Sequence, residues 1–177
     1  MQIMELRLPT PDEEPEFRRM LAAIPADNPA FLHFHRPGMT MAEYLDVLQK
    51  QAAGSDPAPG REVPSTFLFA FVDGRIVGRV SIRHSLDYPL GSLMGHIGYA
   101  VLPEFRGRGH ATELLRLAIL HARQHLGIAR VLVTCDPDNH ASIRVIEKNG
   151  GVFVDEVDNH ANGVRKRRYL IDAPAYD

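Results

Sequence analysis

The sequence predicts a single domain of the α+β (α/β) class, with about six to seven strands and about four helices around one core. Three observations support this. A length of 177 residues with 45% hydrophobic residues is enough for one core and little beyond it. Strand-like runs of period 2 alternate with helix-like runs of period 3.6 along the chain. No internal repeat or low-complexity tract interrupts this order.

The first 64 residues predict one short strand, at residues 3–8, and two helices. The first helix follows Thr10, because a threonine caps the helix, a proline suits its first position and acidic residues suit its positive end. Thr40 begins the second helix, and Glu43 three residues later completes a capping box. Residues 54–64, rich in glycine and proline, mark a boundary inside the domain rather than a linker between domains.

The rest of the chain predicts strands and helices in turn. Asp73-Gly74 is expected to turn a hairpin, and Gly127 to end a long helix. A polar turn at residues 158–163 joins the last two strands. The expected strands cover residues 65–72, 75–85, 93–102, 130–134, 152–157 and 165–171, and the expected helices cover residues 109–126 and 139–149.

Charge and cysteine content exclude several classes of protein. The net charge of −2 does not favour a nucleic-acid or membrane-surface partner. Cys135 is the single cysteine, so an internal disulfide is impossible, and a reducing compartment fits. The N-terminus carries acidic residues where a signal peptide needs basic and apolar ones, and no segment reaches the ~20 apolar residues of a membrane span. We therefore expect a cytoplasmic protein.

A basic loop broken by glycines, PEFRGRGHAT at residues 103–112, stands between an expected strand and the long helix. The first turn of a helix has N–H groups without intrahelical partners, and the helix dipole adds partial positive charge. Gly107 and Gly109 let the backbone approach a bulky anion, while Arg106 and Arg108 add charge and donors. The loop therefore predicts a phosphate or pyrophosphate site, with a plain surface turn as the alternative.

The familiar nucleotide-binding fingerprints fit this loop badly. A third glycine is missing where G-x-G-x-x-G needs one, and no G-K-S/T follows the glycines. Dinucleotide redox chemistry and nucleoside-triphosphate hydrolysis are therefore poor candidates.

Two motifs in this part of the chain resemble the GNAT superfamily of N-acetyltransferases. Arg106-x-x-Gly109-x-Ala111, after YAVLP at residues 99–103, is similar to the acetyl-CoA signature (R/Q)-x-x-G-x-(G/A). The segment TCDPDNHASIRVIEKNGG at residues 134–151 is similar to the next motif of that superfamily, in which an asparagine precedes a helix that ends at a glycine. Two motifs in the correct order are more specific than either alone.

The resemblance covers about residues 65–172, and more loosely the N-terminal strand and helices. Segments RHSL at residues 83–86 and GHIGY at residues 95–99 further resemble a bacterial subgroup of predicted acetyltransferases. The resemblance implies a mixed, mostly antiparallel twisted sheet with two splayed strands at the acyl-CoA site. It also implies one N-acetyltransferase domain over residues 1–177, in which residues 1–64 shape the acceptor side and residues 65–172 form the acetyl-CoA-binding core.

The resemblance implies three groups of cofactor-binding residues. The backbone of the splayed strand would bind the pantetheine arm as an extra strand does and face the thioester oxygen, through Tyr99, Ala100, Val101 and Leu102. The loop amides would hold the pyrophosphate, through Arg106, Gly107, Arg108, Gly109, His110, Ala111 and Thr112. The second motif would contact the arm or its sulfur through Asn139 and Ser142, for which a plain helix cap and a surface serine are the alternatives.

Catalytic residues follow less directly. A protonated lysine-type amine cannot attack a thioester, so a base must accept its proton. We expect His96 to be this base, because the superfamily often places its base on the splayed strand; a core histidine bonded to a carbonyl is the alternative. His84 is a second candidate. Many relatives carry a tyrosine in the second motif's helix that protonates the leaving thiolate, and its absence here leaves Ser142, a water or another tyrosine.

Four other groups of residues outside these motifs have plainer explanations than a functional site. His121 and His125 lie one helical turn apart, without the further ligands of a metal site, so we expect no metal. The basic run at residues 165–168 is expected to pair with acidic residues across strands. Cys135 has no evident activating partner. The aromatic segment at residues 31–36 is where acceptor contacts are sought, with a hydrophobic lid as the favoured alternative.

The predicted function is an acyltransferase. It moves the acetyl group of acetyl-CoA to a primary amine of a small molecule or of a protein, by direct attack in a ternary complex. Two alternatives stay open: a non-catalytic acyl-CoA-binding or sensing module, which the missing tyrosine motivates, and a transferase for another acyl group. Related enzymes often pair, so a homodimer is open as well.

Overall fold

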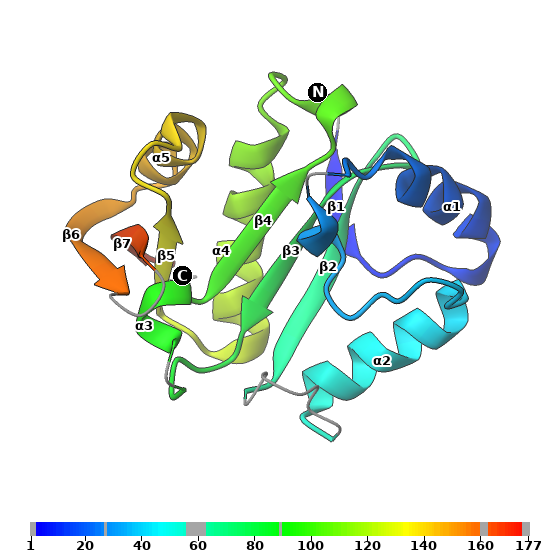
Figure 1. The fold of residues 1–177 in the computed structure, drawn as a ribbon, viewed down its shortest axis with the longest axis horizontal. Helices are drawn as coiled ribbons and strands as arrows, with labels where there is room; N and C mark the ends of the chain where they lie inside the picture. The colour runs from blue at the N-terminus through cyan, green and yellow to red at the C-terminus, as the bar shows by residue number, and fades with distance from the viewer. Residues whose placement is uncertain (1–2, 27, 56–62, 89, 160–162, 175–177) are drawn as a thin grey trace.

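The computed structural model describes residues 3–26, 28–55, 63–88, 90–159 and 163–174. A seven-stranded sheet lies at the centre of the molecule in the order β1-β2-β3-β4-β5-β7-β6, with helices on both faces (Figure 1). The strands are β1 Met4–Arg7, β2 Ser65–Val72, β3 Arg75–Arg83, β4 Ile97–Val101, β5 Arg130–Cys135, β6 Val152–Asn159 and β7 Val164–Asp172. The α-helices in these ranges are α1 Glu14–Ala23, α2 Met41–Ala53, α3 Gly91–Met94, α4 His110–Leu126 and α5 His140–Lys148.

The single mixed domain predicted from the sequence is confirmed. All neighbouring strands pair antiparallel except β4 and β5, which are parallel. Parallel neighbours need a long crossover, and α4 provides it between these two strands. Parts of the expected loop at residues 54–64 and of the expected turn at residues 158–163 lie outside the described residues.

Local sequence signals set most element boundaries. The Thr40–Glu43 capping box begins α2, and Gly54 ends it in the left-handed conformation with φ 68°. The hairpin between β2 and β3 turns at Asp73 and Gly74, both with positive φ. Gly127, with φ 68°, ends α4. The Thr40 cap, the hairpin and the helix stop are therefore present as expected. Thr10 instead precedes a 3-10 turn, Pro11–Glu13, without a side-chain cap hydrogen bond, and α1 begins at Glu14.

One expected strand is wrong at its beginning. Residues 93 and 94 belong to the short helix α3, and β4 begins only at Ile97. Gly95 separates the two elements with φ 68° and ψ −177°, and a Cβ there would lie 2.7 Å from the Leu132 carbonyl oxygen. The chain therefore changes direction at a glycine that packs against β5, and α3 adds a helix to the four expected.

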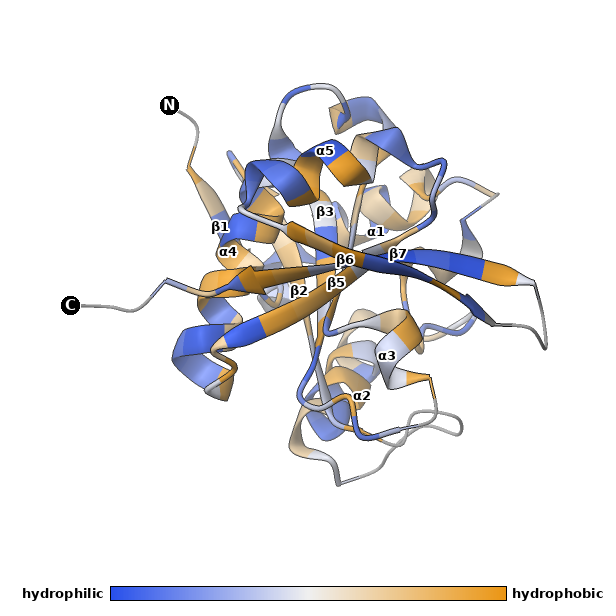
Figure 2. Ribbon diagram, turned by 90° about the vertical axis from the view of Figure 1, so that its left-hand side faces the viewer, coloured by the Kyte–Doolittle hydropathy of each residue, from blue (hydrophilic) through white to orange (hydrophobic). Residues whose placement is uncertain are grey.

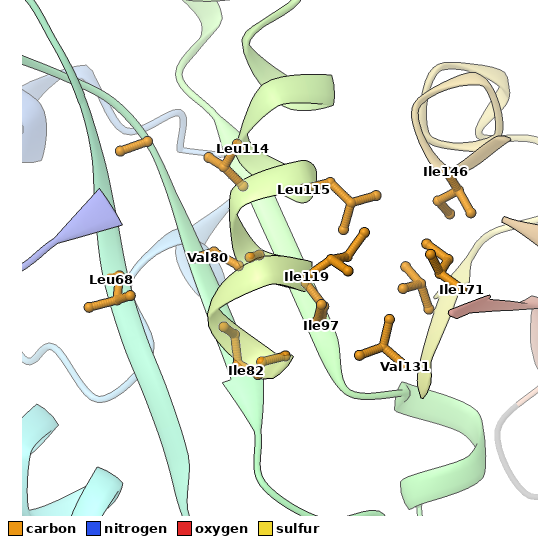
Figure 3. Packing of buried hydrophobic residues seen from close by; sticks show 14 of the residues in the cluster. Leu68, Val80, Ile82, Ile97, Leu114, Leu115, Ile119, Val131, Ile146 and Ile171 are labelled. Atoms are coloured by element: carbon orange, nitrogen blue, oxygen red, sulfur yellow. The ribbon is translucent and has the colours of Figure 1, made fainter. Parts of the chain in front are cut away.

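Two hydrophobic clusters cover the two faces of the sheet. The first lies under α4 and α5, where Leu114, Leu115 and Ile119 pack between the strands and Ile146 (Figure 3). The second lies under α1 and α2 and contains many aromatic side chains, among them Phe17, Phe31, Tyr44, Phe67 and Phe69. Figure 2 shows α5 and α2 on opposite sides of the sheet. None of the described helices is both long and apolar enough to span a bilayer.

The sheet opens between β4 and β5. One pair of residues, Ile97 and Val133, forms the described pairing between these two strands. Just before it, the His96 amide donates to the Leu132 carbonyl at 2.7 Å. From that point the two strands diverge toward α5 and the start of α4 (Figure 1). The splayed strands that the resemblance implies are therefore present, with an unpaired edge of β4 inside the sheet.

Candidate acyl-CoA site

A cavity of about 700 Å³ lies at the open end of the gap between β4 and β5. It is bounded by the end of β4, the loop before α4, the first turn of α4 and one side of α5. Its lining residues are Tyr99, Ala100, Val101, Phe105, Arg106, Gly107, Gly109, His110, Ala111, Thr112, Asn139, Ala141, Ser142, Arg144, Val145 and Lys148. The structure thus brings together all the residues expected to bind a cofactor except Leu102 and Arg108.

The start of α4 presents a row of free backbone donors to this cavity. Among the described residues, the amides of residues 107–111 donate to no backbone acceptor. The amides at the two ends of the expected loop are already used, because Arg106 donates to the Pro103 carbonyl and Thr112 to the Gly109 carbonyl. The donors available to an anion are therefore those of residues 107–111, strengthened by the dipole of α4.

Gly107 and Gly109 shape this row of donors. Both have positive φ, 75° and 83°, which side chains adopt only with strain. A Cβ built on either residue meets nothing within 4 Å, so the space in front of them is open. The two glycines therefore leave room for a bulky group to reach the amides.

Basic side chains stand on two sides of the cavity. Arg106 lines it and is tied to β4, because its Nε donates to the Val101 carbonyl at 3.1 Å. Arg108 is exposed and lies near the ring of Phe105 instead. Arg144 and Lys148 of α5, which were not predicted from the sequence, line the opposite wall. Their spacing of four residues places them on one face of the helix, and that spacing is the signal that could have found them.

At the end of β4, the main-chain groups of some residues face β3 and those of others face the gap. The Leu102 amide donates to the Val77 carbonyl of β3, and its side chain is fully buried in the cluster under α1 and α2. Because main-chain groups alternate in direction along an antiparallel ladder, Ala100 also faces β3, while Tyr99 and Val101 face the gap. At this end of β4, Tyr99 and Val101 therefore direct main-chain groups toward the gap, and the Val101 carbonyl already accepts the Arg106 Nε.

The two residues of the second motif lie where α5 begins. Asn139 caps the helix, and its Oδ1 accepts a hydrogen bond from the Ser142 amide at 3.0 Å. Asn139 is therefore a helix cap, and both Asn139 and Ser142 also line the cavity. Asn149 at the other end of α5 donates to the carbonyls of Thr112 and Val145. It fixes the distance between α4 and α5, which the sequence analysis did not foresee.

The two candidate bases lie away from the cavity. The His96 Nδ1 accepts a hydrogen bond from the Leu132 amide at 2.9 Å, so in a neutral ring the proton is on Nε2. Burial and the nearby Arg83 charge lower the pKa of His96. The ring therefore pins β4 to β5, and its one lone pair is already engaged. His84, just after β3, shares a 2.8 Å hydrogen bond with the Thr66 hydroxyl of β2.

The remaining constellations have structural roles. The basic run of β7 pairs across the strands with acidic residues of β6, as expected, in the pairs Arg165–Asp158, Arg165–Glu156 and Arg168–Asp155. Phe31 is buried, and its carbonyl accepts a hydrogen bond from Arg79, as a lid over the core requires. Within the described ranges, no group of three or more potential metal ligands is arranged to hold an ion. Cys135 is buried, and its pKa is raised by that burial.

A mixed sheet that opens beside a helix start with free amides defines an α/β domain with a site suited to an anion. The chain belongs to the GNAT family: the acetyltransferase (GNAT) domain model matches residues 4–152. This match confirms the family and the enzyme class, an acyltransferase, that the sequence predicted.

Comparisons with individual proteins agree with this family. The chain is similar to a probable N-acetyltransferase of Bacillus subtilis, YjcK, with 32% identity over 83 residues, 47% of this chain and 45% of that protein. The match spans less than half of that relative. Two solved structures share the fold at low identity. They are the ribosomal-protein-S5-alanine acetyltransferase of Vibrio fischeri (TM-score 0.67, 14% identity, 100% of this chain and 99% of that one) and the ribosomal L7/L12 alpha-N-protein acetyltransferase RimL in complex with coenzyme A (TM-score 0.63, 20% identity, 97% and 96%).

Proposed function

We propose that the protein is an acetyl-CoA-dependent N-acetyltransferase that acetylates a primary amine. The observation behind the proposal is the cavity between β4 and β5, with the free amides of residues 107–111 at one end and the unpaired edge of β4 along its side. A diphosphate needs several donors and positive charge, and the start of α4 offers both. The solved relative RimL contains coenzyme A.

The residues present fit the cosubstrate along its length. The amides of residues 107–111 bind the diphosphate, and Arg106, Arg144 and Lys148 balance its charge. The main-chain groups of Tyr99 and Val101 bind the pantetheine arm in the manner of a neighbouring strand. A main-chain N–H of β4 faces the thioester oxygen and stabilises the negative charge that develops there.

The reaction is a direct transfer in a ternary complex. The amine nitrogen attacks the thioester carbon, the C–N bond forms, and the C–S bond breaks with its electron pair on sulfur. The amine gives up one proton to a base. His96 as this base stays a prediction, and it requires Nδ1 to release the Leu132 amide. Otherwise a water accepts the proton. Ser142, at the cavity wall, stays a predicted donor to the sulfur.

The acceptor is an amine of a small molecule or of a protein. RimL acts on a ribosomal protein, and by analogy a protein N-terminus is one candidate here. We assign the acceptor side to residues 1–64 and the acetyl-CoA core to residues 65–172, because the cavity uses only the second part. We place the reaction in the cytoplasm, where the single cysteine is kept reduced.

Thiol release tests the function. The protein is incubated with acetyl-CoA and a broad panel of amines, and free thiol is followed. We expect release above the protein-free rate with at least one amine. Release at the protein-free rate across the panel, together with intact CoA binding by calorimetry, would instead identify a non-catalytic acyl-CoA-binding module. Thermal stabilisation by acetyl-, propionyl- and succinyl-CoA compares acyl preferences, because a ligand that binds the native state raises its stability.

A further inference from the structure

A small number of buried side-chain polar atoms have no hydrogen-bond partner among the described residues. These are His35 Nε2, Tyr88 Oη, Tyr99 Oη, Arg167 Nε and Tyr169 Oη. Of these residues, only Tyr99 lines the cavity. A buried hydroxyl without a partner lowers the stability of the folded state, so such a group at a binding site points to a ligand that satisfies it.

The Tyr99 ring packs at the edge of the cluster under α4 and α5, not on the α1 and α2 side. Ser142 of α5 and Cys135 at the end of β5 both influence its pKa, so the hydroxyl reaches from β4 toward these two residues. Ser142 lies close enough to lower that pKa, but the geometry between the two hydroxyls falls short of a full hydrogen bond.

Helix α5 offers no phenol to the cavity, because its sequence, HASIRVIEK, contains no tyrosine. Ile146 of this helix is fully buried in the core. Ser142 is on the cavity, but an aliphatic hydroxyl is a weaker acid than a phenol, whose ordinary pKa is about 10. Tyr99 brings a phenol to the same cavity from the opposite wall, β4.

We propose that the Tyr99 hydroxyl donates a hydrogen bond to the sulfur of the acyl-CoA thioester and stabilises the thiolate that leaves. The assignment rests on the proposed function and deepens it. As the C–S bond breaks, the electron pair stays on sulfur, and the Tyr99 O–H is directed at the growing charge while its proton stays on oxygen. The thiolate then takes a proton from solvent, since a free thiol has a pKa of about 8.5.

Two properties of Tyr99 suit this role. Burial raises its pKa to about 12, so the hydroxyl stays protonated and able to donate at any pH at which the reaction runs. A hydrogen bond to a charged acceptor in a site shielded from water is stronger than one between neutral groups. The bond is therefore stronger with the leaving thiolate than with the thioester, as catalysis requires.

The test measures the thiol pKa of bound coenzyme A, through the ultraviolet absorbance of its thiolate, in the wild type and in Tyr99→Phe. The substitution removes only the hydroxyl and keeps the ring. We expect the bound thiol pKa to rise by about one unit in Tyr99→Phe, a tenfold loss of thiolate stabilisation, while the variant still binds CoA. With an active amine, kcat should fall by a similar factor while KM for acetyl-CoA stays the same.

Tyr169→Phe is the matched control. It removes another buried, unpartnered hydroxyl near Cys135, but Tyr169 does not line the cavity. We expect no change in the bound thiol pKa in this variant. Equal pKa values in the wild type and Tyr99→Phe, with CoA bound to both, would overturn the Tyr99 role alone. A wild-type protein that does not bind CoA would overturn the proposed function, and the Tyr99 role with it.

Discussion

The two ends of β4 differ in what holds them. At its beginning, the main chain and imidazole of His96 both bond to Leu132, and Ile97 pairs with Val133. From Gly98 onward no register with β5 remains, and Tyr99 has a buried hydroxyl without a described partner. One end therefore closes the sheet, while the other opens it to the cavity.

This contrast shows that a polar residue on a splayed strand has a role that depends on its position along the strand. His96 has the side chain that acid–base chemistry prefers, yet its lone pair holds the last tie between the strands. Tyr99, three residues later, lies past that tie and lines the cavity. The open end is expected to respond to ligand-binding tests, and the closed end to stability tests.

The largest effect is expected from Gly109→Glu at the open end. A carboxylate placed before the free amides repels the diphosphate, and CoA affinity should fall by at least about 100-fold, or ~2.7 kcal/mol. Calorimetry measures it. Gly109→Ala is the control, because it shares the strain of a side chain at φ 83° without the charge. A glutamate variant that binds CoA as well as the alanine variant would contradict the anion site.

A smaller effect is expected from His96→Ala at the closed end. The Leu132 amide loses its acceptor, so the free energy of unfolding should fall by about 1–3 kcal/mol, with CoA affinity nearly normal. Denaturant unfolding measures the loss. His96→Asn should restore much of it, because the Asn Oδ1 can take the place of Nδ1. If His96 is the base instead, both variants lose turnover most at low pH and the asparagine gives no rescue.

Two arginines of the loop test whether a charge must line the cavity, or only lie near it, to strengthen CoA binding. Both are exposed, but Arg106 lines the cavity and is tied to β4, whereas Arg108 is absent from the lining. We expect Arg106→Ala to weaken CoA binding roughly tenfold and Arg108→Ala less than about threefold. The two dissociation constants, measured at one salt concentration, give the comparison. A larger loss in the Arg108 variant would mean that the loop changes shape when it binds CoA.

The smallest effect is a change in the pH dependence of stability. The pKa of His96 is lowered by burial below its ordinary 6.5, so the unfolded chain takes up the proton first as the pH falls. The free energy of unfolding should therefore decline below about pH 6.5. The decline should be less steep in His96→Asn, and the difference in slope should correspond to at most one bound proton. Urea unfolding at several pH values tests this. An identical slope in both proteins would show that the ring is not held neutral by the fold.

Much of the fold was readable from the sequence because its signals act over a few residues. The Thr40 cap, the Asp73-Gly74 turn and the glycine that ends α4 each specify local backbone geometry. The loop of residues 103–112 likewise combines a helix start with glycines, and most of it lines the cavity as expected. The predicted start of β4 was wrong, because it depends on a contact across the sheet: Gly95 packs against Leu132 of β5 and lets the chain change direction there.

The sequence by itself determined the family, the order of most elements and the anion-binding loop, because motifs and caps are encoded by neighbouring residues. Only the tertiary structure decided which side of β4 each residue faces, where the pairing with β5 stops, and that Arg144 and Lys148 face the same cavity as the loop. Those features depend on pairing between segments far apart in the chain. A histidine that ties strands and a tyrosine that faces a cavity are therefore distinguished only by the folded sheet.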